Sequence, residues 1–189
     1  MKSQNKYQTK YQAKIRSLYQ KKLGKSIKKE LEKRGIKKNQ VGEMRSAEDV
    51  ELLSESSVYK ILRGEINLTA DSLYAFLSTF GYKNPVQLFF PNYDFCLELI
   101  SEICLLIVTD TVFDKTLLKN RLIECLDTSY SQFKNACKLQ IDEFVKDNSI
   151  LLLDSIRNFF GECLDEDTSE KISYNLTEWL SELACFFIS

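Results

Sequence analysis

Residues 53–65, with the sequence LSESSVYKILRGE, carry the signals of a complete short α-helix. Ser54 is a residue type that caps helix N-termini, and Gly64 is the type that most often ends a helix. Three apolar residues between them fall on one side of a helix, and polar residues fall on the other. The apolar side comprises Val58, Ile61 and Leu62, and the polar side comprises Glu55, Ser56, Tyr59 and Lys60, with Ser57 at its margin.

Helices are also predicted on both sides of this segment. Upstream, Ser26 is expected to cap a helix that runs through Arg34 and ends at Gly35, and another helix begins within residues 36–44. Downstream, Thr69 is expected to cap a helix that ends at Gly81. Apolar residues at helical spacing in the lysine-rich N-terminus predict a basic amphipathic helix there: Tyr7, Tyr11, Ile15 and Leu18.

With these elements in place, residues 53–65 resemble the recognition helix and closing glycine of the lambda-repressor-like (Cro/XRE-type) helix-turn-helix family. The resemblance covers about residues 26–90. Gly42 resembles the small residue at which the second helix of that family packs on the third. The next helix of the family and its exit are matched by Asn67-Leu68-Thr69, Leu73, Leu77, Phe80-Gly81-Tyr82 and Leu88-Phe89.

The chain departs from the family in the spacing between Gly42 and Ser54, which is about twice the usual length. Residues 45–53 would then form an enlarged turn or an extension of the second helix. Alternatively, Ala47 takes the role of the small residue, with Ser46 and Asp49 as a capping box. We favour Gly42, because the alternative brings acidic side chains close to DNA phosphates; these are Glu48, Asp49 and Glu51.

The resemblance implies how DNA would be contacted. A recognition helix lies in the major groove with its N-terminal exposed residues against base edges. Lys60 is suited to donate to guanine O6 and N7, and Glu55 is suited to accept from cytosine N4. The residues expected at base edges are Glu55, Ser56, Ser57, Tyr59 and Lys60. Those expected at phosphates, which fix the register, are Lys37, Lys38, Gln40 and Arg63.

The charge of the chain is divided between its two halves. Residues 1–63 contain 17 Lys and Arg against 7 Asp and Glu, a net charge of +10. Residues 64–189 contain 9 basic and 20 acidic residues, a net charge of −11. This asymmetry indicates that the basic half binds a polyanion and that the acidic half does not. Charge alone does not separate nucleic acid from an anionic membrane.

The acidic half is predicted to be a helical module. Apolar residues keep a helical rhythm from Phe95 to Phe187, which indicates about five helices. The last segment, residues 184–188, is too apolar for a free tail, so it docks into the core or forms a subunit interface. The expected domains are a basic arm at residues 1–25, a helix-turn-helix domain at residues 26–90 and a dimerisation or regulatory module at residues 91–189.

Several classes of protein are disfavoured by composition. The chain has no histidine, no Gly-rich phosphate loop and no nucleophile elbow, so we expect no enzymatic activity and no cofactor. Its six cysteines contain no Cys-x-x-Cys pair, which disfavours a metal site. We expect them to be reduced thiols in the core of a cytoplasmic protein. No apolar run is long enough to span a membrane.

The fold class predicted from the sequence is therefore all-α, with a helix-turn-helix domain followed by the acidic module. The expected function is sequence-specific transcription regulation, as a repressor, by a homodimer bound to double-stranded DNA. The alternative is an interaction protein of the antitoxin or phage type, whose acidic module binds and inhibits another protein. A small effector bound by the same module is a further candidate partner.

Overall fold

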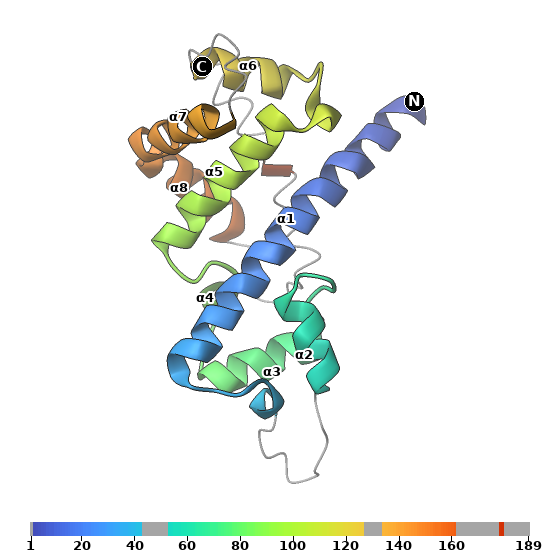
Figure 1. Ribbon diagram of the computed structural model, residues 1–189, viewed down its shortest axis with the longest axis vertical. Coiled ribbons are helices and arrows are strands. Elements are labelled where there is room, and N and C mark those ends of the chain that lie inside the picture. Colours follow the sequence, from blue (N-terminus) through green and yellow to red (C-terminus); the bar gives the residue numbers. More distant parts are fainter. Residues whose placement is uncertain (1, 43–52, 127–133, 162–177, 180–189) are drawn as a thin grey trace. The chain divides into compact units, whose positions relative to one another are not determined.

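A computed structural model describes residues 2–42, 53–126, 134–161 and 178–179 of the chain (Figure 1). Every regular element in these residues is helical, so the predicted all-α class is confirmed for them. The α-helices are α1 (Lys2–Arg34), α2 (Glu55–Leu62), α3 (Ala70–Phe80), α4 (Val86–Phe89), α5 (Tyr93–Thr109), α6 (Leu117–Cys125), α7 (Lys134–Asp147) and α8 (Ser149–Gly161). Two short 3-10 helices are η1 (Lys38–Gln40) and η2 (Thr111–Phe113).

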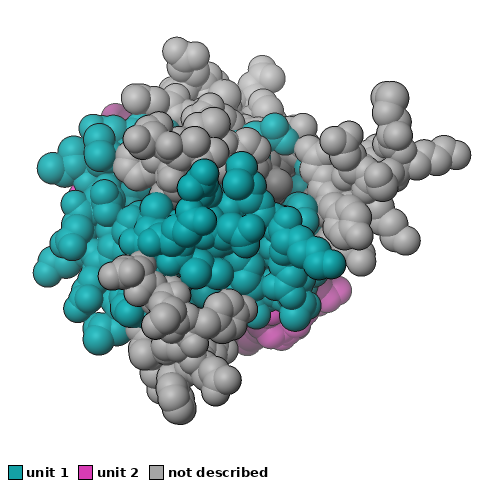
Figure 2. Space-filling view, turned by 90° about the horizontal axis from the view of Figure 1, so that it is seen from above, with its two compact units in different colours: residues 1–15, 96–162, 174–189 teal, residues 16–95, 163–173 magenta. Residues whose placement is uncertain are grey.

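The chain divides into two compact units, which Figure 2 colours separately. Unit 1 comprises residues 1–15, 96–162 and 174–189, and unit 2 comprises residues 16–95 and 163–173. Both α1 and α5 contribute residues to each unit. The candidate site predicted from the sequence falls entirely in unit 2.

Helix α1 is a single helix of 33 residues. The helix start predicted at Ser26 is therefore wrong, and the boundary expected between residues 25 and 26 falls inside α1. Buried side chains on both sides of Ser26 explain its continuity, because Leu23 and Ile27 pack into the core in successive turns. The predicted end is confirmed: Gly35 has a φ of +67°, and the N–H of Ile36 donates to the Leu31 carbonyl at 3.0 Å.

The helices predicted around residues 54–64 and 69–81 are confirmed as α2 and α3. Ser54 caps α2, since its side chain accepts from the N–H of Ser57, and Gly64 follows the helix with a φ of +68°. Thr69 caps α3 in a reciprocal arrangement with Ser72, and Gly81 ends it in the left-handed region. These ends were predictable because each capping signal lies within three residues of the group that it satisfies.

The helix expected to begin within residues 36–44 is not formed in the described residues. Only the 3-10 turn η1 occurs there, followed by extended Val41 and by Gly42 with a φ of +83°. A Cβ on Gly42 would lie 3.5 Å from that of Ala75, an ordinary contact. Gly42 therefore serves the backbone turn and not a close helix packing. Residues 43–52, which include the alternative positions at Ser46, Ala47 and Asp49, lie outside the described residues.

The core of unit 2 fixes which side of α2 faces outward. Val58 is fully buried and Ile61 is 4% exposed. They belong to an apolar core with side chains of α1, α3 and α4, and the hydroxyl of Tyr19 donates to the carbonyl of Phe89 at 3.3 Å within it. Other members of this core are Leu23, Ile27, Leu31, Leu62, Leu68, Phe76, Phe80 and Leu88. Burying such side chains is the main stabilising contribution to the unit.

Unit 1 contains four of the helices predicted for the acidic half: most of α5, with α6, α7 and α8. Tyr11 of α1 stacks on Phe113 with ring centroids 4.9 Å apart. The fifth predicted helix lies outside the described residues apart from residues 178–179, as does the apolar segment at residues 184–188. Trp179 is fully buried and its indole N–H donates to the hydroxyl of Ser155 at 2.8 Å.

Candidate nucleic-acid interface

The N-terminus of α2 is held by two serine side chains. The Oγ of Ser54 accepts from the N–H of Ser57 at 3.3 Å, and the two hydroxyl oxygens lie 2.9 Å apart. Ser57 is half-buried, whereas Ser54 is exposed. The hydroxyl of Ser57, predicted to lie at base edges, is thus engaged in the cap, which rigidifies the first turn of α2.

The remaining predicted base-contacting residues all lie on the exposed side of α2. Tyr59 is 39% exposed, and the other three are also exposed. Ile61 and Leu62 on the opposite side are buried, so the division of faces inferred from the sequence is confirmed. The exposed set is Glu55, Ser56, Tyr59 and Lys60. Contact of these side chains with DNA remains a prediction.

The position of α2 on α1 is set by two glycines. A Cβ on Gly24 of α1 would lie 2.6 Å from the carbonyl oxygen of Ile61, and one on Gly64 would lie 2.6 Å from the main-chain nitrogen of Lys21. Real Cβ atoms do not approach backbone so closely, so the two main chains meet without an intervening side chain. The turn at Gly64 was predicted from the sequence, whereas no local signal marked the role of Gly24.

The 3-10 turn η1 lies against α2 and carries two of the predicted phosphate-contacting residues, Lys38 and Gln40, while a third, Lys37, directly precedes it. The N–H of Lys37 donates to Oε1 of Gln40 at 2.8 Å, so the Gln40 side chain stabilises the turn itself. The ammonium of Lys38 lies 4.2 Å from the centroid of the Tyr59 ring. A cation over an aromatic face is attracted by the electron density of the ring. One predicted phosphate residue and one predicted base residue therefore form a contact.

Arg63, the fourth predicted phosphate residue, is already paired. Its Nε and Nη2 donate to the two carboxylate oxygens of Glu65 at 2.6 Å and 2.9 Å. These hydrogen bonds raise the pKa of Arg63 and lower that of Glu65. A planar two-point pair uses the same guanidinium edge that would contact a phosphate. Glu65 was not among the predicted site residues, although it lies only two positions after Arg63 in the sequence.

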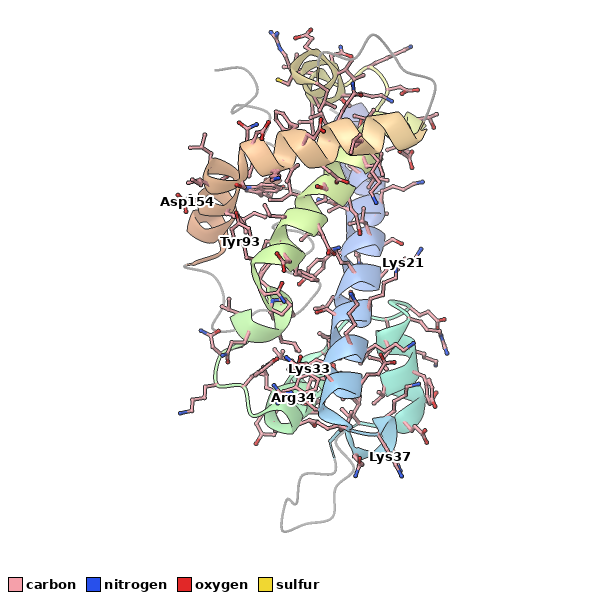
Figure 3. All side chains as sticks on the ribbon, turned by 60° about the vertical axis from the view of Figure 1, so that its left-hand side comes forward. Lys21, Lys33, Arg34, Lys37, Tyr93 and Asp154 are labelled. Atoms are coloured by element: carbon pink, nitrogen blue, oxygen red, sulfur yellow. The ribbon has the colours of Figure 1, made fainter. Side chains whose placement is uncertain are left out.

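Figure 3 places two lysines on the side of α1 where α2 lies. Lys37 is near one end of α2, and Lys21 is near the other, where its backbone contacts Gly64. Both side chains are exposed. Lys21 was not among the predicted site residues, because its nearness to α2 depends on a contact 43 positions away in the sequence. Positive charge therefore lies near both ends of α2.

The described residues also bear on the expectations for metal sites, membrane spans and thiols. They contain no group of three or more Cys, Asp or Glu side chains arranged to hold a metal ion, and no helix long and apolar enough to cross a membrane. Cys104 is fully buried, which raises the pKa of its thiol to about 12. Cys96 and Cys137 are also buried, but Cys125 is exposed, so the prediction of a core thiol is wrong there.

Comparison with known proteins assigns no family to this chain. A scan against protein-family models, a search of curated proteins and a search of solved structures each found no match. Function is therefore inferred from the residues of α1, η1 and α2.

Proposed function

We propose that this chain is a sequence-specific DNA-binding transcription regulator, of repressor type, that inserts the exposed face of α2 into the major groove. The observation that carries the proposal is the set of exposed donors and acceptors on a capped helix whose other face is buried. Glu55, Ser56 and Lys60 supply the polar groups that distinguish base pairs in that groove. A rigid helix presents them in a fixed register.

Size and charge support the same partner. The eight residues of α2 span about 12 Å at 1.5 Å per residue, similar to the width of the major groove. Lys37 is exposed and Lys38 is half-buried at the edge of α2, where they can contact the phosphates that border a groove.

The proposed active form is a cytoplasmic homodimer, because helices of this type contact two half-sites about one DNA turn apart. Large apolar side chains exposed on α7 and α8 of unit 1 support self-association through the acidic half. They are Leu139, Ile150 and Leu151. Sedimentation equilibrium of the intact chain at micromolar concentration tests this part, and a monodisperse, folded monomer would contradict it.

Lys60→Ala tests DNA recognition by α2. An operator is first selected from random duplexes with the intact chain. Lys60→Ala should then weaken binding to that operator by about 1–3 kcal/mol, with little change on an unrelated duplex, because a base-edge donor is lost. Lys83→Ala is the matched control, since Lys83 is an exposed lysine of the same unit outside α2. Circular dichroism confirms that both variants remain folded.

An interaction protein is the second candidate function. Its supporting observation is a set of large exposed side chains in unit 2. Tyr59 of α2 is 39% exposed, Ile66 between α2 and α3 is 39% exposed, and Tyr74 of α3 is 63% exposed. Aromatic side chains are enriched in protein interfaces. If the intact chain selects no duplex, or Lys60→Ala weakens operator and unrelated duplex equally, α2 does not discriminate bases and this second function is preferred.

A further inference from the structure

One face of α1 within unit 2 carries lysines at helical spacing. Lys21, Lys25 and Lys28 follow one another at intervals of four and three residues, which places them above one another on the same side. All three side chains are exposed, whereas Leu23, Ile27 and Leu31 of the same helix are buried. We call these three residues the lysine ridge.

The ridge differs in its partners from two other cations of α1, Lys14 and Arg34. Lys14 donates to Asp110 at 2.7 Å, and Arg34 donates to Glu30 at 2.5 Å. In contrast, Lys21 and Lys25 have no carboxylate partner among the residues that the structure describes. Within the described part of the chain, the one carboxylate paired with Lys28 is that of Glu32, 3.7 Å away in a solvent-exposed pair, and such a pair is weak. The charge of the ridge is therefore available to a partner.

The ridge continues from the end of the proposed DNA-contacting helix. Gly64, just after α2, lies against the main chain of Lys21, and Gly24 in the next turn of α1 lies against the carbonyls of Ile61 and Leu62. Both contacts involve backbone atoms of two helices in one unit. Because the backbone fixes this crossing, Lys21 stays beside α2, and the ridge extends from it along α1.

We propose that the lysine ridge binds the phosphate backbone of duplex DNA that flanks the groove entered by α2. This inference rests on the function proposed above. The ridge rises about 10 Å along α1, which corresponds to about three phosphates at 3.4 Å per nucleotide of one strand. It replaces part of the phosphate contact expected of Arg63, which is engaged by Glu65.

Duplex DNA fits the ridge better than an anionic membrane does. A helix that lies on a membrane inserts an exposed apolar face beside its lysines. Among the side chains of α1 described from residue 11 onward, no large apolar one is exposed. The ridge therefore supplies the positive charge that contacts phosphates, but it has no exposed apolar side chains to insert into a membrane.

The test compares two triple variants of the intact chain that remove the same charge. Lys21→Gln, Lys25→Gln and Lys28→Gln together remove the ridge; Lys83→Gln, Lys138→Gln and Lys146→Gln remove three exposed lysines elsewhere. Binding is measured on the selected operator and an unrelated duplex from 50 to 300 mM salt. The ridge triple should flatten the slope of log K against log salt by about 2–3. It should weaken binding to both duplexes by the same factor, about 100- to 1000-fold at 0.1 M salt.

A third variant, with arginine at the three ridge positions, separates charge from folding and should bind with the wild-type slope. If the ridge triple keeps the wild-type slope on both duplexes, the ridge inference is overturned. The proposed function is judged separately, by whether Lys60→Ala weakens binding to the operator selectively. If the intact chain binds no duplex, both fail. If the ridge triple loses binding to phosphatidylserine vesicles but not to DNA, the ridge is a membrane contact and the inference is again overturned.

Discussion

The main chains of Gly24 and Leu62 are in direct contact. A Cβ atom on Gly24 would lie 2.7 Å from the carbonyl oxygen of Leu62, which is closer than carbon and oxygen atoms approach in proteins. Gly24 belongs to the middle of α1, and Leu62 is the last residue of α2. The absence of a side chain at position 24 therefore sets how closely the two helices cross.

Gly24→Ala should destabilise the protein by about 1–3 kcal/mol, because the added methyl group meets backbone that cannot move away cheaply. At an unconstrained helix position the same change would instead stabilise by about 1 kcal/mol. Ser26→Ala is the control on the same helix and should change stability by less than about 0.5 kcal/mol, since Ser26 caps nothing. Urea unfolding measures both. A Gly24→Ala variant as stable as wild type would contradict the close crossing.

Ser54→Ala should cost about 1 kcal/mol, because the N–H of Ser57 loses its acceptor at the start of α2. Ser56→Ala is the control in the same turn and should be close to neutral, since Ser56 is exposed and alanine favours helix. Thermal unfolding followed by circular dichroism compares the two. Equal melting temperatures would show that the Ser54 cap contributes nothing.

The contact of Lys38 with Tyr59 predicts a measurable coupling. A double-mutant cycle with Lys38→Ala and Tyr59→Leu should give a coupling free energy of about 0.5–1 kcal/mol in the free protein. On DNA, Lys38→Ala should weaken all sequences about equally and flatten the salt slope by about one unit. Lys38→Arg should keep both the coupling with Tyr59 and the wild-type salt slope, because the positive charge is retained. A selective loss on the operator would instead assign Lys38 to a base edge.

The ion pair between Asp110 and Lys14 predicts that the stability of unit 1 depends on pH. The Lys14 ammonium donates to its carboxylate at 2.7 Å, and the N–H of Val112 donates at 2.9 Å; both lower the pKa of Asp110 below its ordinary value of 3.8. A lowered pKa in the folded state stabilises the protein above pH 3.8, and this contribution is lost as pH falls through the folded pKa.

Asp110→Asn should therefore lower the melting temperature at pH 7, and its difference from wild type should shrink as pH falls below about 4. Asp142→Asn is the control, because Asp142 is an exposed carboxylate on α7. Scanning calorimetry from pH 7 to pH 2.5 provides the comparison. A difference between Asp110→Asn and wild type that stays constant over this range would show that the ion pair does not stabilise the fold.

Trp179 predicts that the described part of the C-terminal segment contributes to the stability of unit 1. Ser155→Ala should cost about 1–3 kcal/mol, because the buried indole N–H is left without an acceptor. Trp179→Phe combined with Ser155→Ala should cost less than the sum of the single changes, since no unpaired donor remains. Urea unfolding of the three variants measures this, and strictly additive effects would argue against the hydrogen bond.

Local features of the fold were predictable from the sequence. The caps at Ser54 and Thr69 and the left-handed glycines at positions 64 and 81 satisfy groups only a few residues away, so their residue types suffice. The buried and exposed faces of α2 followed from helical spacing, because a short helix packed on a core must bury its apolar side. The all-α class followed from the same periodicity.

Tertiary structure decided what local signals could not. Ser26 has the residue type of a cap, yet α1 continues through it because its flanking side chains are buried in the core of unit 2. Gly24 is required because the carbonyl of Leu62 lies against it, and Lys38 contacts Tyr59 because η1 packs on α2. These relationships join residues far apart in the chain. Their free energy depends on distances that only the packed core sets, so no short window of sequence contains them.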